Sequence, residues 1–420
     1  MKQIFYGIVI ISILWGCNNP TTLSQQLFEA VNTNNINKVQ KLAKKMDVNI
    51  RDQAGNSPLV YAAAKGYSEM LNLLIKSGID PHGDDGGIAL ILATKQGSAD
   101  SVKSLIEAGV AVDFMLPKGI TPLKIAAKQG YTEIAQALLA AGAIADLSGK
   151  DGETPLIIAS KEGYLELVKI LLQAKAKPNS QTCNGVTALQ EASHNGHIEV
   201  VKTLLDSKAN PNIVDNTGKG ALYWASQENK VEVVKLLLQA GARVNVADKS
   251  YYRTPLMAAA ILGHTDVVKV LLKAKANPNA ATPMKETVVM QAASAGYAEI
   301  VQLLLNAGAR VNTKMEYFNG GETALMMASR KGHEEVVKTL LKAGAKVDVR
   351  NSSHNQTALI LAAEQGHAGV VKLLLQVGAN FDVEDDFGYT ALGYAHDSGY
   401  EDIIQVLRAQ GATTLRVRYR

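Results

Sequence analysis

A short pattern that returns about every 33 residues constrains this chain more than any other feature. The pattern is Thr-Pro-Leu or a close variant, and eleven such anchors follow one another at spacings of 31, 33, 33, 33, 33, 34, 33, 36, 34 and 33 residues. A degenerate first copy begins near Gln25, which makes twelve. A fixed period of this kind predicts a solenoid whose stacked units contact only their neighbours. The anchors begin at Ser57, Ile88, Thr121, Thr154, Thr187, Gly220, Thr254, Thr287, Thr323, Thr357 and Thr390.

Each copy reads as two helices. Thr is a good N-cap and Pro suits the first helical position, so the anchor starts a helix. Leu and an Ala pair such as Ala126-Ala127 let that helix pack closely, and a Gly such as Gly130 ends it. A run such as Glu199 to Leu205 then forms the second helix. Glu and Lys three residues apart, such as Glu166 and Lys169, are predicted to pair on its outer face.

These anchors and this period resemble the ankyrin repeat, over residues 25–412. The resemblance implies an all-α repeat fold, an ankyrin solenoid of about 12 helix-turn-helix repeats with β-turn fingers. The His that the family carries after Leu is replaced here, for example by Lys124 and Gln190. The usual His link between neighbouring copies is therefore expected to be missing, with apolar contacts in its place. Three copies carry Lys where a left-handed Gly is expected, at a strain of about 1 kcal/mol each. These lysines are Lys175, Lys208 and Lys275.

The composition narrows the class of protein. The chain has 420 residues, 47% of them hydrophobic, and a net charge of +4, so we expect one long array in place of three domains. The near-neutral balance gives no reason to expect nucleic acid as a partner. No nucleotide-binding loop or catalytic cluster is present, so no enzyme activity, cofactor, metal or small-molecule substrate is expected.

The N-terminus reads as an export signal. Residues 1–16 contain Lys2 and a 12-residue apolar run, which is too short to cross a bilayer. The following Cys17 completes a motif that resembles the lipobox of bacterial lipoproteins, although Trp15 is bulky for it. That resemblance implies lipidation of Cys17, a tether over residues 17–24, and a place in the bacterial cell envelope. Asn18 after the Cys favours the outer membrane, facing the periplasm or the surface. An ordinary signal peptide or an uncleaved anchor is the alternative.

Several polar clusters invite a chemical interpretation. His194 and His197 form an H-x-x-H pair, but His197 follows Gly196 in a slot that His or Tyr fills for packing in many copies. Asp80, His82, Asp84 and Asp85 lie close in a predicted turn, without the Gly and Glu that a calcium loop requires. Cys183 falls at a predicted finger tip, as a harmless thiol or as half of an intermolecular disulfide.

In the ankyrin family, partners usually contact the concave face formed by the finger tips and the exposed side of the first helices. Most residues at those positions are polar here, but two neighbouring fingers are rich in the Tyr, Met and Arg that are enriched at interfaces. We therefore predict a patch within residues 223–331, or, alternatively, aromatic side chains that fold back into the array. Trp224 is assigned to the core. The candidate partner-binding residues are Tyr223, Tyr251, Tyr252, Arg253, Ile261, Leu262, Met284, Tyr317, Phe318, Arg330 and Lys331.

The function predicted from these features is a protein-binding scaffold, exported and anchored to the membrane through the N-terminal lipid. Two alternatives stay open: a dedicated regulator or protector of one envelope enzyme, and a surface or secreted effector that binds a host protein. Residues 413–420 are interpreted as a basic C-terminal tail.

Overall fold

The computed structural model describes residues 22–316 and 320–413, and these residues form 24 α-helices in twelve consecutive pairs. Within that part of the chain there is no β-strand, only isolated bridges at the bases of fingers. The predicted all-α solenoid of twelve helix-turn-helix copies is therefore confirmed. The signal at 1–16, Cys17, Tyr317, Phe318 and residues 414–420 of the tail lie outside the described residues. No described helix combines the length and the apolar character needed to span a bilayer.

The chain divides into two compact units at residues 147 and 148. Unit 1 contains α1 (Leu23–Asn32), α2 (Ile36–Ala43), α3 (Pro58–Lys65), α4 (Ser68–Lys76), α5 (Gly83–Lys95), α6 (Ala99–Glu107), α7 (Pro122–Gln129) and α8 (Thr132–Ala140). Unit 2 contains α9 (Pro155–Glu162), α10 (Leu165–Gln173), α11 (Ala188–Asn195), α12 (Ile198–Asp206), α13 (Ala221–Gln227), α14 (Val231–Gln239), α15 (Pro255–Ile261), α16 (Thr265–Lys273), α17 (Val288–Ala295), α18 (Ala298–Asn306), α19 (Ala324–Lys331), α20 (Glu334–Lys342), α21 (Ala358–Glu364), α22 (Ala368–Gln376), α23 (Ala391–Asp397) and α24 (Glu401–Ala409).

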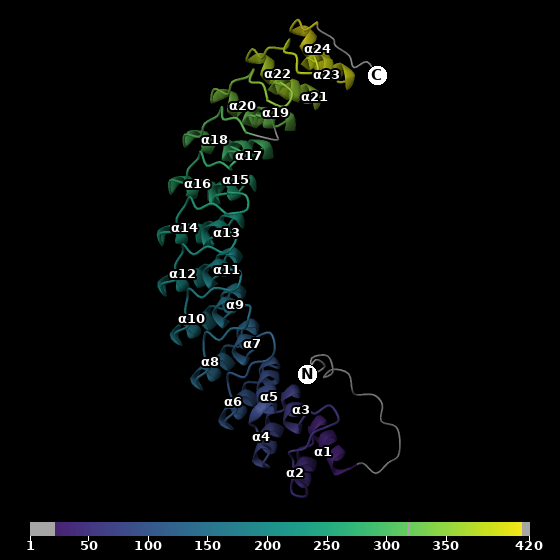
Figure 1. The fold of residues 1–420 in the computed structure, drawn as a ribbon, viewed down its shortest axis with the longest axis vertical. Coiled ribbons are helices and arrows are strands. Elements are labelled where there is room, and N and C mark those ends of the chain that lie inside the picture. Colours follow the sequence, from purple (N-terminus) through teal and green to yellow (C-terminus); the bar gives the residue numbers. More distant parts are fainter. Residues whose placement is uncertain (1–21, 317–319, 414–420) are drawn as a thin grey trace. The chain divides into compact units, whose positions relative to one another are not determined.

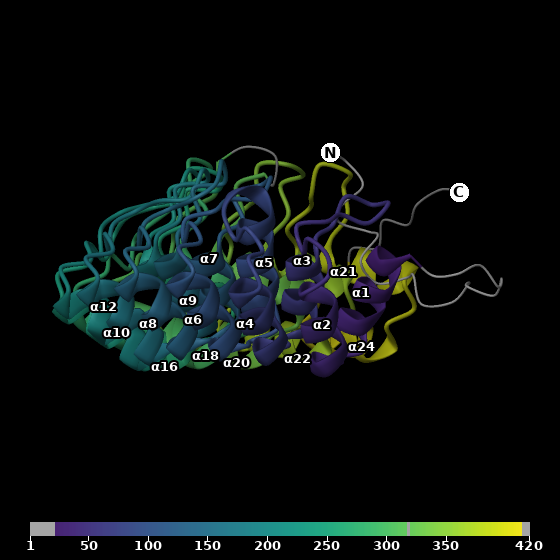
Figure 2. The ribbon, with the colours of Figure 1, turned by 90° about the horizontal axis from the view of Figure 1, so that it is seen from below.

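Inside each unit the odd-numbered first helices form one row and the even-numbered second helices form another (Figure 1). The fingers that join one copy to the next gather on one side of the helices (Figure 2). Within a unit, each first helix packs against the first helices of neighbouring copies, and each second helix does the same in its own row. This arrangement places the residue four after each anchor, such as Trp224, on the side of the first helix that faces the fingers.

The anchor works as the sequence predicts. In α7, the Thr121 hydroxyl oxygen accepts the Lys124 amide N–H at 3.2 Å, and Pro122 occupies the first turn. Gly130 ends the helix with a φ of 71°, in the left-handed region that favours Gly. The apolar positions of both helices are buried, since Leu123 and Leu204 are at most 2% exposed.

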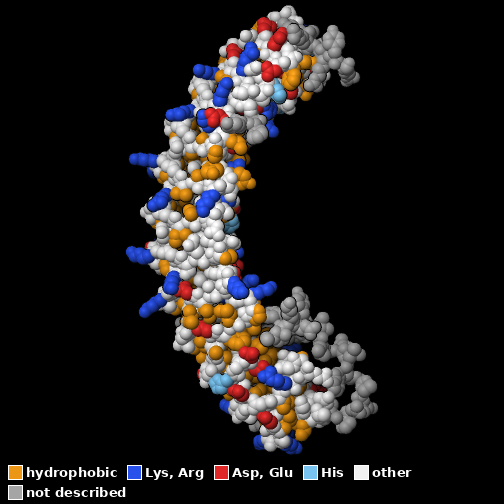
Figure 3. Space-filling view, viewed as in Figure 1, with side chains coloured by type: hydrophobic (Ala, Val, Ile, Leu, Met, Phe, Trp, Pro, Cys, Tyr) orange, Lys and Arg blue, Asp and Glu red, His pale blue; other side chains and the backbone are white. Residues whose placement is uncertain are grey.

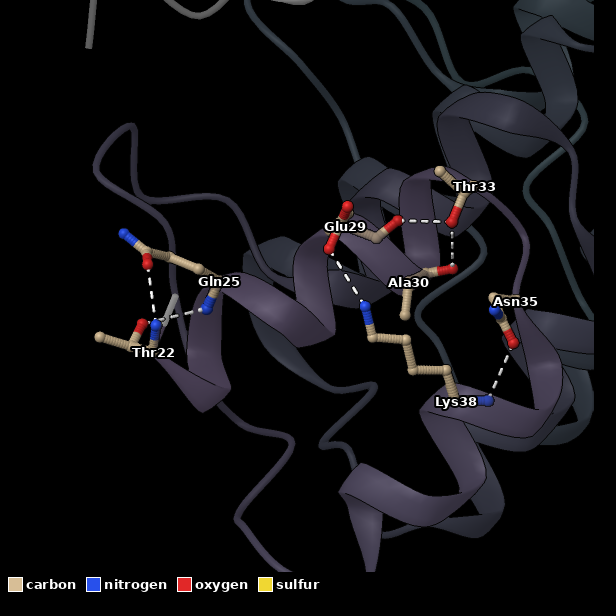
Figure 4. Close-up of polar contacts among 7 residues, drawn as sticks. All are labelled: Thr22, Gln25, Glu29, Ala30, Thr33, Asn35 and Lys38. Carbon is tan, nitrogen blue, oxygen red and sulfur yellow. Dashed lines mark hydrogen bonds and ion pairs between the residues drawn. The ribbon is translucent and has the colours of Figure 1, made fainter. Parts of the chain in front are cut away.

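The degenerate first copy is a complete helix pair (Figure 4). Thr22 caps α1 through a capping box, in which its hydroxyl accepts the Gln25 N–H at 3.2 Å and its own N–H donates to the Gln25 side chain at 2.9 Å. The helix therefore begins at Leu23, within the segment interpreted as the tether. Lys38 from α2 pairs with Glu29 of α1 at 3.1 Å.

Neighbouring copies are joined by side-chain hydrogen bonds to backbone groups. After most second helices, an Asn or Asp side-chain oxygen accepts a backbone N–H from the next copy, as Asn212 does from Arg243 at 2.8 Å and Asp113 does from Ile144 at 3.0 Å. A His in the slot after the helix-ending Gly adds a second link, because His264 Nε2 lies 2.9 Å from the Gln227 carbonyl oxygen. Polar links between copies thus exist, although the His after the anchor Leu is absent.

One copy of unit 1 departs from the pattern. The 31-residue spacing before Ile88 leaves no room for a full finger, and α5 starts early, at Gly83. Asp84 and Asp85 consequently lie in the first turn of a helix and not in the predicted turn. Asp85 pairs with Arg51 at 2.9 Å.

Candidate functional site

The finger tips of unit 2 are joined edge to edge by single backbone hydrogen bonds. Each bond runs from an N–H at the start of one tip to a carbonyl in the preceding finger. The three successive bonds are Cys183 to Asp151 at 2.8 Å, Asn216 to Asn184 at 2.9 Å and Lys249 to Thr217 at 2.7 Å. These three bonds lace four successive fingers into a continuous rim.

A Gly at the left-handed position of each tip makes this close approach possible. A Cβ atom on Gly185 would lie 2.9 Å from the Asn216 side-chain oxygen and 3.0 Å from the Asn216 backbone nitrogen. Gly152 and Gly218 are equally crowded by the finger that follows them. The tip Gly is therefore required for two reasons: its φ is left-handed, and the following finger leaves no space for a Cβ atom.

The lacing stops between the finger 248–254 and the finger 282–287, and we call this gap the finger seam. Tyr252 stands at the left-handed tip position with a φ of 56°. Pro283 occupies the position of the donors Cys183 and Lys249, and a Pro has no N–H to donate. No backbone bond joins these two fingers among the described residues, and lacing resumes where the Glu316 N–H donates to the Met284 carbonyl at 2.8 Å.

Large apolar side chains stand exposed on both sides of the finger seam. Tyr251 is 65% exposed, Tyr252 53% and Met284 51%. The Arg253 guanidinium lies 5.1 Å from the centre of the Tyr251 ring, within the range of a cation–π contact. We call Tyr251, Tyr252, Arg253 and Met284 the seam patch. The alternative that these aromatics fold back into the array is wrong for Tyr251 and Tyr252.

Buried polar groups hold the seam finger in place. Asp248, at 1% exposed, accepts the backbone N–H groups of Ser250 and Tyr251 at 2.8 and 2.7 Å. Tyr223 packs beside it and is only 5% exposed. Burial, followed by the charge of the Asp248 carboxylate, raises the pKa of Tyr223 to about 12. The prediction of Tyr223 as a partner contact needs correction, because its side chain supports the finger from below.

Trp224 also differs from its prediction, because it is only half-buried and not part of the core. Its ring meets His194 edge-on at 5.1 Å, and the Lys219 ammonium lies 4.5 Å from its centre. The assignments of the two neighbouring aromatics, Tyr223 and Trp224, are thus exchanged. The signal that could have found Trp224 is its place four residues after the anchor, where the helix faces the fingers.

A second apolar area lies at the far end of α15. Leu262 is 47% exposed, whereas Ile261 is half-buried. The Tyr297 ring covers Gly263, where an added Cβ would approach it to 2.7 Å, and yet Tyr297 stays 37% exposed. Sequence reasoning treated the Tyr297 slot as packing alone and missed this exposed edge.

The remaining candidates are less suited to a partner. Arg330 forms an ion pair with Glu322, which is 3% exposed, so this guanidinium is committed inside its own copy. Burial lowers the pKa of Arg330, while the Glu364 charge opposes this effect. Lys331 is exposed at the end of α19.

The polar clusters noted in the sequence make structural contacts and do not form a chemical site in the described part of the chain. His197 Nε2 lies 2.9 Å from the Lys161 carbonyl oxygen, and its ring packs on Gly163. Within the described ranges, no three His, Cys, Asp or Glu side chains are grouped closely enough to hold a metal ion. Cys183 is an exposed free thiol on its finger.

Comparison with known proteins identifies the family to which these helix pairs are similar. A family model for ankyrin repeats, built as three copies, matches residues 11–85, 27–116, 90–182, 162–248, 192–282, 256–351 and 325–416. No curated protein matches the chain. Among solved structures, the ankyrin repeat domain of human ASB11 is 28% identical with a TM-score of 0.48, over 54% of this chain and 99% of that one.

Proposed function

Because the chain belongs to the ankyrin-repeat family, we propose that it is a non-enzymatic scaffold that binds a protein partner at the seam patch. Ankyrin repeats imply protein–protein interaction, and function on a shared fold depends on the surface residues of each member. The finger seam is the observation that carries the proposal. Tyr251, Tyr252 and Met284 are exposed where the polar rim of laced fingers is interrupted.

The chemistry of the seam patch suits an interface. Exposed Tyr, Met and Arg are enriched at the centres of protein interfaces, where a few such side chains carry most of the binding energy. The finger that carries Tyr251 is already held by Asp248, so little ordering is needed when a partner binds. The half-buried Trp224 extends the apolar surface toward the preceding copy, and Leu262 and Tyr297 extend it along the first helices.

The test compares two triple variants of the full chain in a crosslinking pull-down from the native envelope. The first combines Tyr251→Ala, Tyr252→Gly and Met284→Ala. The control combines Ile198→Ala, Val377→Ala and Phe387→Ala, which removes side chains of 42%, 51% and 57% exposure elsewhere in unit 2. We expect the first variant to lose a protein that wild type and control retain. Equal capture by both variants would overturn the proposal, as would a large loss of folding in the seam variant alone.

We also propose export and lipid anchoring through Cys17, in the envelope of a bacterium. The support is in the sequence: the short apolar run after Lys2, followed at once by Gly16 and Cys17. Two or more acyl chains would give stable anchoring, whereas one chain binds a bilayer only marginally. Mass spectrometry of the mature N-terminus tests this, and an unmodified Cys17 would contradict it.

A further inference from the structure

The turn that follows each second helix carries three comparable positions in every copy. The first is the left-handed residue that ends the helix, the second lies two residues later, and the third lies four residues later. Lys175, Lys208 and Lys275 occupy the first position with φ values of 64°, 68° and 62°. Gly241 and Gly308 occupy it in the two remaining copies of this stretch.

Five consecutive copies of unit 2 each place a cation in this turn. Where the first position is Gly, the second is Arg, as in Arg243 and Arg310. Where the first position is Lys, the second is Asn210 or Asn277 in two copies, and Lys177 adds a further cation in the third. The third position is Asn in all five copies, and none of the three positions is acidic there. We call Lys175, Lys208, Arg243, Lys275 and Arg310 the basic edge.

Most of these turns carry the opposite charge in unit 1. The first of its four turns, after α2, holds both Lys45 and Asp47, and the other three contain no cation at these positions and one acid each. Those acids are Asp80, Asp113 and Asp146. Beyond the basic edge, Lys346 is balanced by Asp348, and the next turn holds only Asp382. The overall net charge of +4 conceals this division.

The fold does not require these cations. Gly241 and Gly308 fill the first position without strain, whereas a Lys with positive φ is strained there. All five side chains of the basic edge are exposed, and none makes a hydrogen bond or ion pair within the described residues. The lysines of the second helices behave differently, since Lys169 and Lys235 are paired with Glu166 and Glu232 at 2.7 and 2.6 Å. Figure 3 shows Lys and Arg side chains projecting at intervals along unit 2.

The basic edge has a fixed pitch. The Asn at the third position accepts a backbone N–H from the second position of the next copy, as Asn179 does from Asn210 and Asn279 does from Arg310, at 2.7 and 2.8 Å. Helices of adjacent copies pack about 10 Å apart, so the cations follow one another at about that interval. An extended polypeptide advances about 10 Å in three residues.

The edge ends beside an open hollow of about 630 Å³ with the same character. Lys314, Lys346 and Arg350 line it together with Asn312 and Asn351. The Lys314 ammonium donates to the Arg350 carbonyl oxygen at 2.9 Å, which keeps the two cationic residues close. An anionic chain lying on the edge could therefore continue into a second group of cations.

We propose that the basic edge is a docking site for an extended acidic segment of a protein partner, separate from the seam patch. A single file of cations fits a linear chain better than a bilayer, which would respond to a broad basic face that the paired second-helix lysines do not provide. Single-stranded nucleic acid is usually held by stacking on aromatic side chains, and the three turn positions carry none in these five copies.

The test uses charge-removing substitutions that the array itself supplies. The edge variant of the full chain combines Lys175→Gly, Lys208→Gly, Lys275→Gly, Arg243→Asn and Arg310→Asn. Each new residue already stands at the equivalent position of another copy, so the fold is retained. The control removes the same five charges from the second helices through Lys169→Gln, Lys202→Gln, Lys235→Gln, Lys338→Gln and Lys372→Gln.

The probe is a fluorescent peptide of about 15 residues, enough to span about 50 Å, with Glu at every third position and Ser elsewhere. Five exposed ion pairs at about 0.4 kcal/mol each correspond to about a 30-fold effect. We therefore expect the edge variant to bind about 30-fold more weakly in low-salt fluorescence anisotropy, and the control variant within threefold of wild type. We expect circular dichroism to show unchanged helix content in both variants, and urea unfolding to show an edge variant at least as stable as wild type, because Gly relieves the positive φ of the three lysines.

Three results would overturn the proposal. The first is an equal loss in both variants, which would show an effect of net charge alone. The second is tighter, edge-dependent binding of a 15-nucleotide oligo-dT, and the third is the same for phosphatidylserine vesicles. A seam variant that still binds the peptide supports two separate surfaces, so this test can succeed or fail whatever happens to the seam patch.

Discussion

The laced fingers and the finger seam are built from the same repeat and differ at two positions. At Gly185 the tip is small enough for the next finger, and the Asn216 N–H reaches the Asn184 carbonyl. At Tyr252 the tip is large, and Pro283 has no N–H to offer. The comparison teaches that two substitutions convert a closed polar rim into an open apolar one while the helices beneath remain stacked.

The largest expected effect comes from disrupting a laced finger. Gly185→Ala places a Cβ 2.9 Å from the Asn216 side-chain oxygen on a backbone with a φ of 79°. We expect a loss of about 2–3 kcal/mol in the free energy of unfolding, measured in urea. The matched control is Gly241→Ala, at a φ of 83° with nothing within 4 Å of the new Cβ, which should lose only about 1 kcal/mol. Equal losses would mean that the contact between fingers contributes nothing.

A smaller and opposite effect is expected at the finger seam. Tyr252→Gly relieves a bulky residue from a φ of 56°, so the free energy of unfolding should rise by about 1 kcal/mol while partner binding falls. Tyr251→Gly, at the neighbouring position, should bring no gain in stability. A destabilised Tyr252→Gly chain would show instead that the Tyr252 ring packs usefully in the free protein.

The last expected effect is confined to alkaline pH. The pKa of Tyr223 is about 12 in the folded chain, above its ordinary value of 10, so the folded state holds the phenol proton more tightly. This contribution is complete below pH 10 and declines as the pH rises from 10 toward 12. Tyr223→Phe should therefore flatten the fall of stability over that window, with Tyr251→Phe as the unaffected control. Identical pH profiles for Tyr223→Phe and wild type would contradict the support that Tyr223 gives to the seam finger.

Much of the fold could be predicted because each repeat contains residues that mark where its helices begin and end. The Thr caps, the Gly stops and the left-handed lysines all lie where the sequence places them. The exceptions have local causes. A spacing two residues short extends α5, and Trp224, four residues after its anchor, faces the fingers while the neighbouring Tyr223 is buried.

The candidate site was less predictable, because it depends on contacts between copies. Residue type identified Tyr251, Tyr252 and Met284, and the structure exposes all three. The absence of a backbone hydrogen bond from Pro283 to the preceding finger becomes visible only when neighbouring fingers are compared in the structure. The basic edge escaped notice for a similar reason, since its cations stand at two different positions of the turn and no single position of the repeat is basic throughout.

The finger seam also has a mechanical consequence. In a one-dimensional stack, each copy is supported by its neighbours, and any disturbance spreads through their shared interfaces. Helix stacking and finger lacing act in parallel over most of unit 2, but no backbone bond between fingers spans the step from the finger 248–254 to the finger 282–287, where helix stacking and the bond from the Asn277 N–H to the Asn245 side chain remain. A force that bends this unit should therefore separate the fingers at this step first. A partner bound between Tyr251 and Met284 would then be held more weakly or more tightly as the unit bends, so its affinity would depend on the bending.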